Sequence, residues 1–171
     1  MVITEKEFKS QINQSGKKNY WKYKGYGNRW YYYKEAARIT EALNPKTVLE
    51  AGTMGVRVFM GSDTINYNKR SAWKTNEEDT YWHDLAQIPY PISKKYDLFI
   101  AMRVMHRIEG ETDVDVVDHK AIFNEIRRIC KSVLIAVPES WDWRIYTDTK
   151  PDIVETKRKK GKEKTCIYFW K

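Results

Sequence analysis

Cysteine is scarce in this chain of 171 residues, and long apolar runs are missing altogether. The two cysteines, Cys130 and Cys166, each lie beside an apolar, strand-like run, which argues against a disulfide scaffold and indicates a reducing compartment. No apolar run approaches the roughly 20 residues that a membrane-spanning helix needs. The first residues, MVITEKEFKSQINQSGKK, also lack the apolar core of a secretory signal. We therefore expect a cytoplasmic protein without a membrane span.

Familiar ligand motifs are missing as well. The three histidines and two cysteines show no metal-ligand spacing, and there is no Gly-Lys-Ser/Thr phosphate loop. Hydrophobic residues nevertheless make up 42% of the chain, which excludes wholesale disorder and allows one domain with a real core. We predict a single domain over residues 1–171, and no metal.

Acidic residues are absent from YWKYKGYGNRWYYYK (20–34), in which eight residues are aromatic. This segment could stack nucleic-acid bases on its rings, or it could cover a small-molecule pocket. The net charge of +8 favours polyanions in general. Much of that charge, however, is concentrated in KRKKGKEK (157–164), a pattern that is more typical of a solvated turn. Charge alone therefore does not establish nucleic-acid binding.

Two helices are predicted in the first third of the chain. Thr4 and Glu7 form the pattern of a capping box at the start of a short helix. A longer helix follows the aromatic segment, with apolar residues at helical spacing between Tyr32 and Leu43. It ends at Asn44-Pro45, because proline disfavours helical geometry at the residue before it. The run TVLEA (47–51) then predicts a short buried strand.

The second half of the chain predicts a parallel sheet with an antiparallel end. YDLFIAM (96–102) and SVLIAVP (132–138) are continuous apolar runs, typical of strands covered on both faces. The segment between them, DHKAIFNEIRRICK (118–131), has one apolar helical face, which completes a βαβ unit. Residues 151–171 predict a hairpin with a basic turn. The predicted fold is α/β: a Rossmann-like, mostly parallel central sheet flanked by helices, with a C-terminal antiparallel hairpin.

The stretch TVLEAGTMG joins a strand to a glycine-containing turn, where ligands of α/β sheets bind. In order, this stretch, HDL (83–85), YDLFIAMRVMHRI (96–108) and the hairpin resemble the class I S-adenosylmethionine-dependent methyltransferases over roughly residues 30–171. The resemblance implies that Glu50 and Gly52 hold the methionine part of S-adenosylmethionine. It also implies that Asp84 contacts the adenine amino group, while Leu85 packs on the ring.

Two further positions follow from the resemblance, together with two departures from the family pattern. The fourth strand and its loop, including Met102, would line the cofactor. Asp63 resembles the acid that holds the ribose hydroxyls, although it comes early for that role. Met54 stands where a glycine is common. VRVFMG (56–61) follows the first strand too closely for a parallel crossover, so it turns back antiparallel, forms a stunted helix or remains an irregular wall.

The resemblance also suggests a role for the N-terminal extension, residues 1–34. At this position an aromatic lid could cover the cofactor, its rings facing the sulfonium and Gly25 and Gly27 acting as hinges. The alternative is that Trp30, Tyr32 and Tyr33 pack the helix onto the sheet.

Acceptor-side residues are expected after the fourth and fifth strands. His106 is the candidate catalytic residue, as a general base, unless it only shapes the pocket. Trp141, Trp143 and Tyr146 could wall a substrate site or simply cover an apolar edge.

Three functions follow from these patterns. The first is an S-adenosylmethionine-dependent methyltransferase acting on an unidentified acceptor. The second is a degenerate methyltransferase-like scaffold that binds a partner, which would apply if Met54, Phe59 or the tyrosines fill the volume beyond Glu50. The third is a basic, aromatic nucleic-acid-binding protein.

Overall fold

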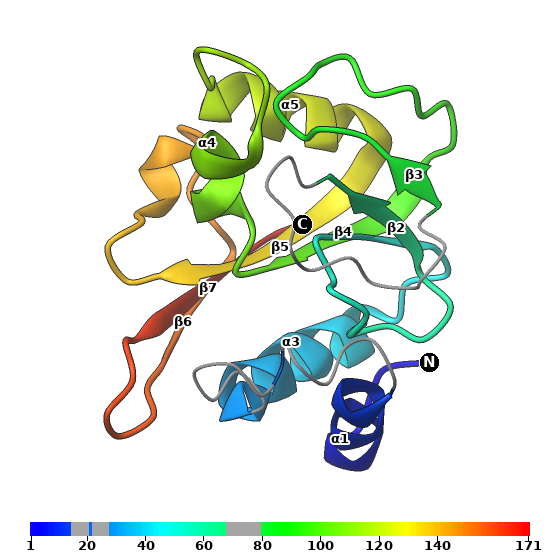
Figure 1. Cartoon of the computed structure of the whole chain (residues 1–171), viewed down its shortest axis with the longest axis vertical. Helices are drawn as coiled ribbons and strands as arrows, with labels where there is room; N and C mark the ends of the chain where they lie inside the picture. Colours follow the sequence, from blue (N-terminus) through cyan, green and yellow to red (C-terminus); the bar gives the residue numbers. More distant parts are fainter. Residues whose placement is uncertain (15–20, 22–27, 68–79) are drawn as a thin grey trace.

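The central feature of the computed structural model is one seven-stranded sheet (Figure 1). The structure describes residues 1–14, 21, 28–67 and 80–171. The strand order is β3-β2-β1-β4-β5-β7-β6. The strands are β1 (Val48–Ala51), β2 (Asp63–Asn66), β3 (Tyr81–Trp82), β4 (Tyr96–Met102), β5 (Cys130–Pro138), β6 (Ile153–Lys157) and β7 (Thr165–Trp170).

Most of the sheet is parallel. The pairs β1–β2, β1–β4, β2–β3 and β4–β5 all run in the same direction. Strand β7 is inserted antiparallel between β5 and β6, with Pro138 of β5 opposite Thr165 of β7. The predicted fold class is therefore confirmed, including the C-terminal hairpin. The carboxyl ends of β1, β2, β4 and β5 share one edge of the sheet, which is called the carboxyl edge below.

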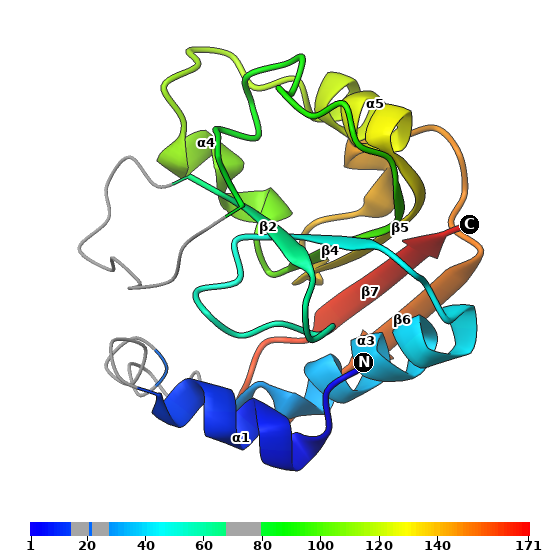
Figure 2. The ribbon, with the colours of Figure 1, turned by 90° about the vertical axis from the view of Figure 1, so that its right-hand side faces the viewer.

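Helices cover both faces of the sheet (Figures 1 and 2). On one face lie α1 (Glu5–Asn13) and α3 (Trp30–Leu43), and on the other lies α5 (His119–Ile129). Short turns of helix, η2 (Met105–Arg107), α4 (Ile108–Glu111) and η3 (Trp143–Ile145), follow β4 and β5. Alternate residues of β4 enter the two cores: Leu98 and Ile100 pack on the α3 side, and Phe99 and Ala101 on the α5 side. Within the described ranges, no helix is long and apolar enough to cross a membrane.

Local signals explain where these helices begin and end. Thr4 and Glu7 form the predicted capping box of α1. Asp118 caps α5 by accepting from Ala121 N at 2.9 Å. Helix α3 ends at Asn44, which adopts the left-handed conformation with φ of 50°.

The connection from β1 to β2 contains no helix. Residues 56–61 form an irregular wall, which settles the three alternatives left by the sequence. Ile3 N donates to Val58 O at 2.9 Å, and Val2 forms an isolated bridge with Phe59. Val58 is buried in the same cluster as Phe8 of α1. The N-terminal segment therefore packs on this wall and supplies part of the cover that a crossover helix would give.

Most aromatic side chains in the described part of the aromatic segment are buried or partly buried in the protein. Tyr32 and Tyr33 are each 2% exposed, and Trp30 is partly buried against Phe8. These residues pack α3 onto the sheet, which is the alternative to a lid that the sequence left open for them. Trp21 is also 2% exposed and donates through Nε1 to Met54 O at 3.1 Å. The hinge glycines and Tyr23 lie outside the described residues, so the lid remains a prediction.

Candidate functional site

Glu50 lies at the carboxyl end of β1, beneath the irregular wall. Its carboxylate accepts from Val58 N and Phe59 N, each at 2.8 Å, and from Ser62 Oγ at 2.9 Å. Burial raises the pKa of Glu50 to about 7, although all three hydrogen bonds act in the opposite direction. The carboxylate is thus used to hold the β1–β2 connection in place, and both of its oxygens are engaged.

Gly52 follows in the turn after β1, with φ of +57°. A Cβ atom at this position would lie 2.5 Å from Val104 Cγ2 and 3.0 Å from Val104 Cγ1. Glycine is therefore needed for the backbone conformation and for the close approach of the loop after β4. Met54, where a glycine was expected, also has a positive φ of 46° and is followed by Gly55.

Asn66 is a site residue that the sequence did not reveal. It ends β2, and its Oδ1 accepts from Thr53 N at 3.2 Å in the glycine turn. Its carbonyl accepts from His83 N at 3.0 Å. Asn66 therefore links the carboxyl ends of three neighbouring strands. Strand β2, DTIN, is too short and polar to be recognised from periodicity, and no other signal marks this residue.

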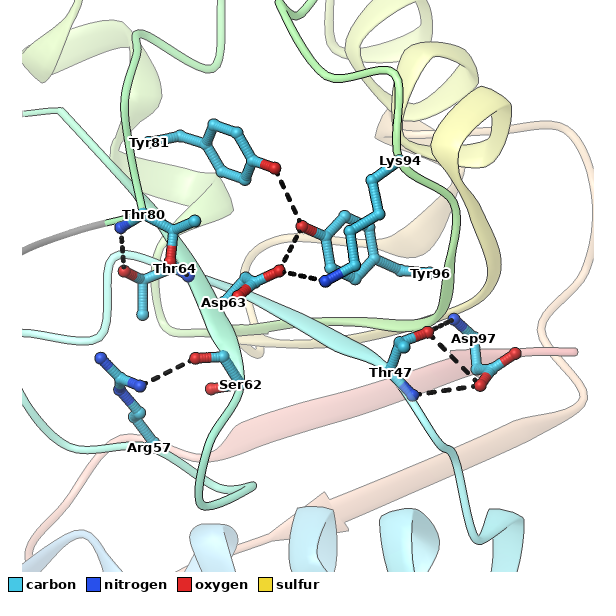
Figure 3. Close-up of polar contacts among 10 residues, drawn as sticks. All are labelled: Thr47, Arg57, Ser62, Asp63, Thr64, Thr80, Tyr81, Lys94, Tyr96 and Asp97. Carbon is cyan, nitrogen blue, oxygen red and sulfur yellow. Dashed lines mark hydrogen bonds and ion pairs between the residues drawn. The ribbon is translucent and has the colours of Figure 1, made fainter.

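Asp63 lies at the opposite end of β2 (Figure 3). Its Oδ2 accepts from Lys94 Nζ and from Tyr96 Oη, each at 2.6 Å. Burial opposes ionisation, but these hydrogen bonds outweigh it and lower the pKa of Asp63. As the first residue of its strand, Asp63 is at the amino end, away from the glycine turn. This placement gives no support to the ribose-binding role that its type suggested.

Asp84 and Leu85 lie just beyond β3, as expected, and both are buried. Asp84 Oδ1 accepts from Ala86 N at 2.9 Å, while Oδ2 accepts from Thr112 Oγ1 at 2.6 Å and from Asp113 N at 3.2 Å. The carboxylate therefore connects this segment to the loop after α4. Tyr67, next to Asn66, hydrogen-bonds the Asp113 carboxylate and brings the same loop to the end of β2.

His106 lies in η2, beyond the carboxyl end of β4. Its Nδ1 is buried and has no hydrogen-bond partner among the described residues. Burial, together with the charges of Arg103, Arg107 and Arg29, lowers the pKa of His106 to about 3. Its ring makes an edge contact with Trp141, at 6.1 Å between centroids. The imidazole is therefore neutral and leaves one buried acceptor or donor atom for a ligand.

The remaining predicted residues divide between site and core. Met102, the last residue of β4, is buried on the α3 side. Trp141 and Trp143 are partly buried at the end of β5, whereas Tyr146 is fully buried in the core. The structure therefore brings Gly52, Asn66, Asp84 and His106 to one edge and separates Asp63 from them.

Comparisons with known proteins support the fold. No family model and no curated protein matches the sequence. Magnesium protoporphyrin IX methyltransferase from Synechocystis, crystallised with S-adenosylmethionine, is similar in structure, with a TM-score of 0.52 and 10% sequence identity. The alignment covers 99% of this chain and 97% of that protein. A putative RNA methyltransferase from Pyrococcus horikoshii gives a TM-score of 0.50, 14% identity, and coverage of 99% and 96%. At these identities the similarity concerns the fold. The chain therefore has the fold of the class I S-adenosylmethionine-dependent methyltransferases.

Proposed function

We propose that this protein is an S-adenosylmethionine-dependent methyltransferase. The observation that carries the proposal is the seven-strand order, with the Glu50–Gly52 turn at the carboxyl end of β1. Ligands of open α/β sheets bind beyond this edge. One structurally similar protein was crystallised with S-adenosylmethionine. We place the cofactor at the same edge in this chain.

The residues at the edge bring polar and apolar groups for a nucleoside to the ends of β2 and β3. Asn66, Asp84 and Leu85 supply an amide, a carboxylate and an apolar side chain, although both oxygens of Asp84 already accept hydrogen bonds within the protein, as those of Glu50 do. The turn after β1 offers backbone groups, since Glu50 is engaged with its own loop. In this arrangement Asp84 holds the adenine amino group and Leu85 packs on the ring. Glu50 acts through the turn that it positions.

His106 is placed to meet the methyl acceptor. When bound, the cofactor supplies an electrophilic methyl group, and orientation of the acceptor provides much of the rate. A neutral imidazole with an unpartnered Nδ1 can accept a hydrogen bond from an O–H or N–H of the acceptor. Because its pKa is so low, His106 is a weak base and is better suited to orientation than to complete proton removal.

Calorimetric titration with S-adenosylmethionine and S-adenosylhomocysteine tests the proposal. We expect both to bind, and Asp84→Asn to weaken binding at least tenfold. Asp63→Asn makes the same chemical change at the amino end of β2, so it is the matched control and should leave affinity within twofold. Circular dichroism confirms that each variant is folded. Absence of heat with both ligands, in folded protein, would overturn the assignment.

A scaffold that no longer binds the cofactor is the second candidate, and two observations favour it. The space of a Cβ atom at Gly52 is already filled by Val104, and both oxygens of Glu50 are engaged by residues of the β1–β2 connection. The same titration decides between the two candidates, because a scaffold gives no heat with either ligand.

A further inference from the structure

Basic side chains from three separate segments gather at the carboxyl edge. Arg29 precedes α3, while Arg103 and Arg107 follow β4, and the charges of all three act on His106. The third segment is the β6–β7 turn, residues 157–164, which carries six basic residues and one acidic residue. Its net charge of +5 is more than half of the chain's +8. These segments are called the basic rim below.

Hydrogen bonds show that the β6–β7 turn belongs to this edge. Tyr31 Oη lies 3.4 Å from both Glu163 O and Thr165 Oγ1, which brings the start of α3 against the turn. Arg103 Nη2 lies 3.1 Å from Glu163 Oε2, which brings the loop after β4 against it too. Figure 1 shows the turn, the start of α3 and α4 along one side of the sheet. The start of α3 and the loop after β4 therefore both lie against the β6–β7 turn.

Acidic residues offset only part of the charge at this edge. Glu163 pairs with Arg103, Glu111 with Arg107 and Glu139 with Lys164, while Lys157 pairs with Glu35 and Glu155. Lys159, Lys160 and Lys162 remain exposed at the tip. A concentration of exposed cations on one side of a molecule attracts a polyanion and makes its binding dependent on salt.

An aromatic surface lies within the basic rim, beside His106. The Trp141 ring is partly buried and contacts the rings of His106 and His119, at 6.1 and 5.5 Å between centroids. It also stacks with Tyr146, which fixes its orientation. Cations that surround a fixed aromatic ring are the combination used to bind single-stranded nucleic acids, whose phosphates meet the cations while a base meets the ring.

We infer that the methyl acceptor is a single-stranded nucleic acid, held by the basic rim with a base against Trp141 and His106. This inference rests on the proposed function for the methylation step, but the binding itself needs no cofactor. The acceptor class therefore follows from the β6–β7 turn and Trp141, not from the aromatic segment at residues 20–34, whose Trp21 and Tyr33 are buried.

Fluorescence anisotropy with a labelled 20-nucleotide RNA, in the absence of cofactor, tests the inference. The triple variant Lys159→Gln/Lys160→Gln/Lys162→Gln removes three charges from the rim. Lys46→Gln/Lys150→Gln/Lys171→Gln removes the same charge from exposed positions at the amino edge. We expect at least a tenfold loss of affinity at 50 mM salt for the rim variant. Its log–log salt slope should fall by about 2, because each phosphate contact contributes about 0.7. The control variant should stay within twofold.

Two further measurements distinguish binding of a single-stranded nucleic acid from unspecific attraction between charges. Trp141→Leu keeps an apolar side chain and should weaken RNA binding about fivefold or more, since stacking is lost, while leaving heparin binding unchanged. Single-stranded DNA should bind comparably, and duplex DNA more weakly. Equal losses in the two triple variants, an unchanged affinity in Trp141→Leu, or equal binding of duplex and single strands would each overturn the inference. Failure of cofactor binding would overturn the proposed function and leave these results intact.

Discussion

Replacing Gly52 with alanine tests whether the turn after β1 is held by the loop after β4. The substitution has two separate costs. Alanine must adopt φ of +57°, which costs about 1–2 kcal/mol for a residue with a Cβ atom. Its Cβ would also lie 2.5 Å from Val104 Cγ2, and such overpacking costs about 1–3 kcal/mol. We expect a total loss of about 2–5 kcal/mol in the free energy of unfolding.

A double-mutant cycle separates the two costs. In a Val104→Ala background the methyl groups that block the new Cβ are gone, so only the backbone cost of about 1–2 kcal/mol should remain. Gly61 provides a matched control, because it also has a positive φ, +82°, but nothing lies within 4 Å of its virtual Cβ. Gly61→Ala should therefore cost only the backbone term, in either background.

Urea denaturation followed by circular dichroism measures all of these values. The reasoning predicts a coupling of about 1–3 kcal/mol between Gly52→Ala and Val104→Ala. It predicts none between Gly61→Ala and Val104→Ala. A coupling near zero in the first pair would refute the contact as the reason for the glycine, and a Gly52→Ala protein as stable as the parent would refute both terms.

Three other outcomes are expected. Because burial raises the pKa of Glu50 from 4.5 to about 7, its contribution to stability is fully present below pH 4.5 and is lost as the pH rises through 7. The difference in unfolding free energy between Glu50→Gln and the parent should therefore change by up to about 3 kcal/mol over this range, and a constant difference in urea denaturation would contradict it. Trp21→Phe removes the donor to Met54 O and should cost about 1 kcal/mol in the same assay, whereas an unchanged stability would show that the bond contributes nothing. The lowered pKa of His106 predicts that any methylation rate has no step near pH 6.5 from this residue, and a step that disappears in His106→Asn would contradict its neutral state.

Elements with strong local signals were predictable from the sequence. The capping box at Thr4, the end of α3 at Asn44 and the strands at Tyr96–Met102 and Cys130–Pro138 all rest on residue patterns within a few positions. Strands β2 and β3 were not predicted, because four and two residues are too few to show a period of two. Their partners in the sheet, and not their own sequences, make them strands.

The site was predictable only in part, for the same reason. Glu50 and Gly52 lie at the end of a recognisable strand, and Asp84 was found through the family resemblance; all three lie at the carboxyl edge. Asp63 was assigned from its residue type, because β2, at whose start it lies, was not recognised from the sequence. Val104 and Asn66 were missed because their roles depend on contacts across the sheet. Asp63 and Asn66 stand at opposite ends of the short strand β2, and only Asn66 is at the carboxyl edge, where we place the ligand.

The β1–β2 connection without a helix also has a consequence for how this chain can vary. Parallel strands are usually joined through a helix that covers the sheet, but here part of that cover comes from α1, through Phe8 against Val58. Insertions in the connection and deletions of the first thirteen residues are therefore not independent changes. A natural variant that gains a helix between Gly52 and Asp63 could discard its N-terminal segment, whereas one that keeps the short connection must keep α1. Loss of the N-terminus by proteolysis or by a late start codon would thus leave a chain with an intact site sequence and a sheet that has lost part of its cover.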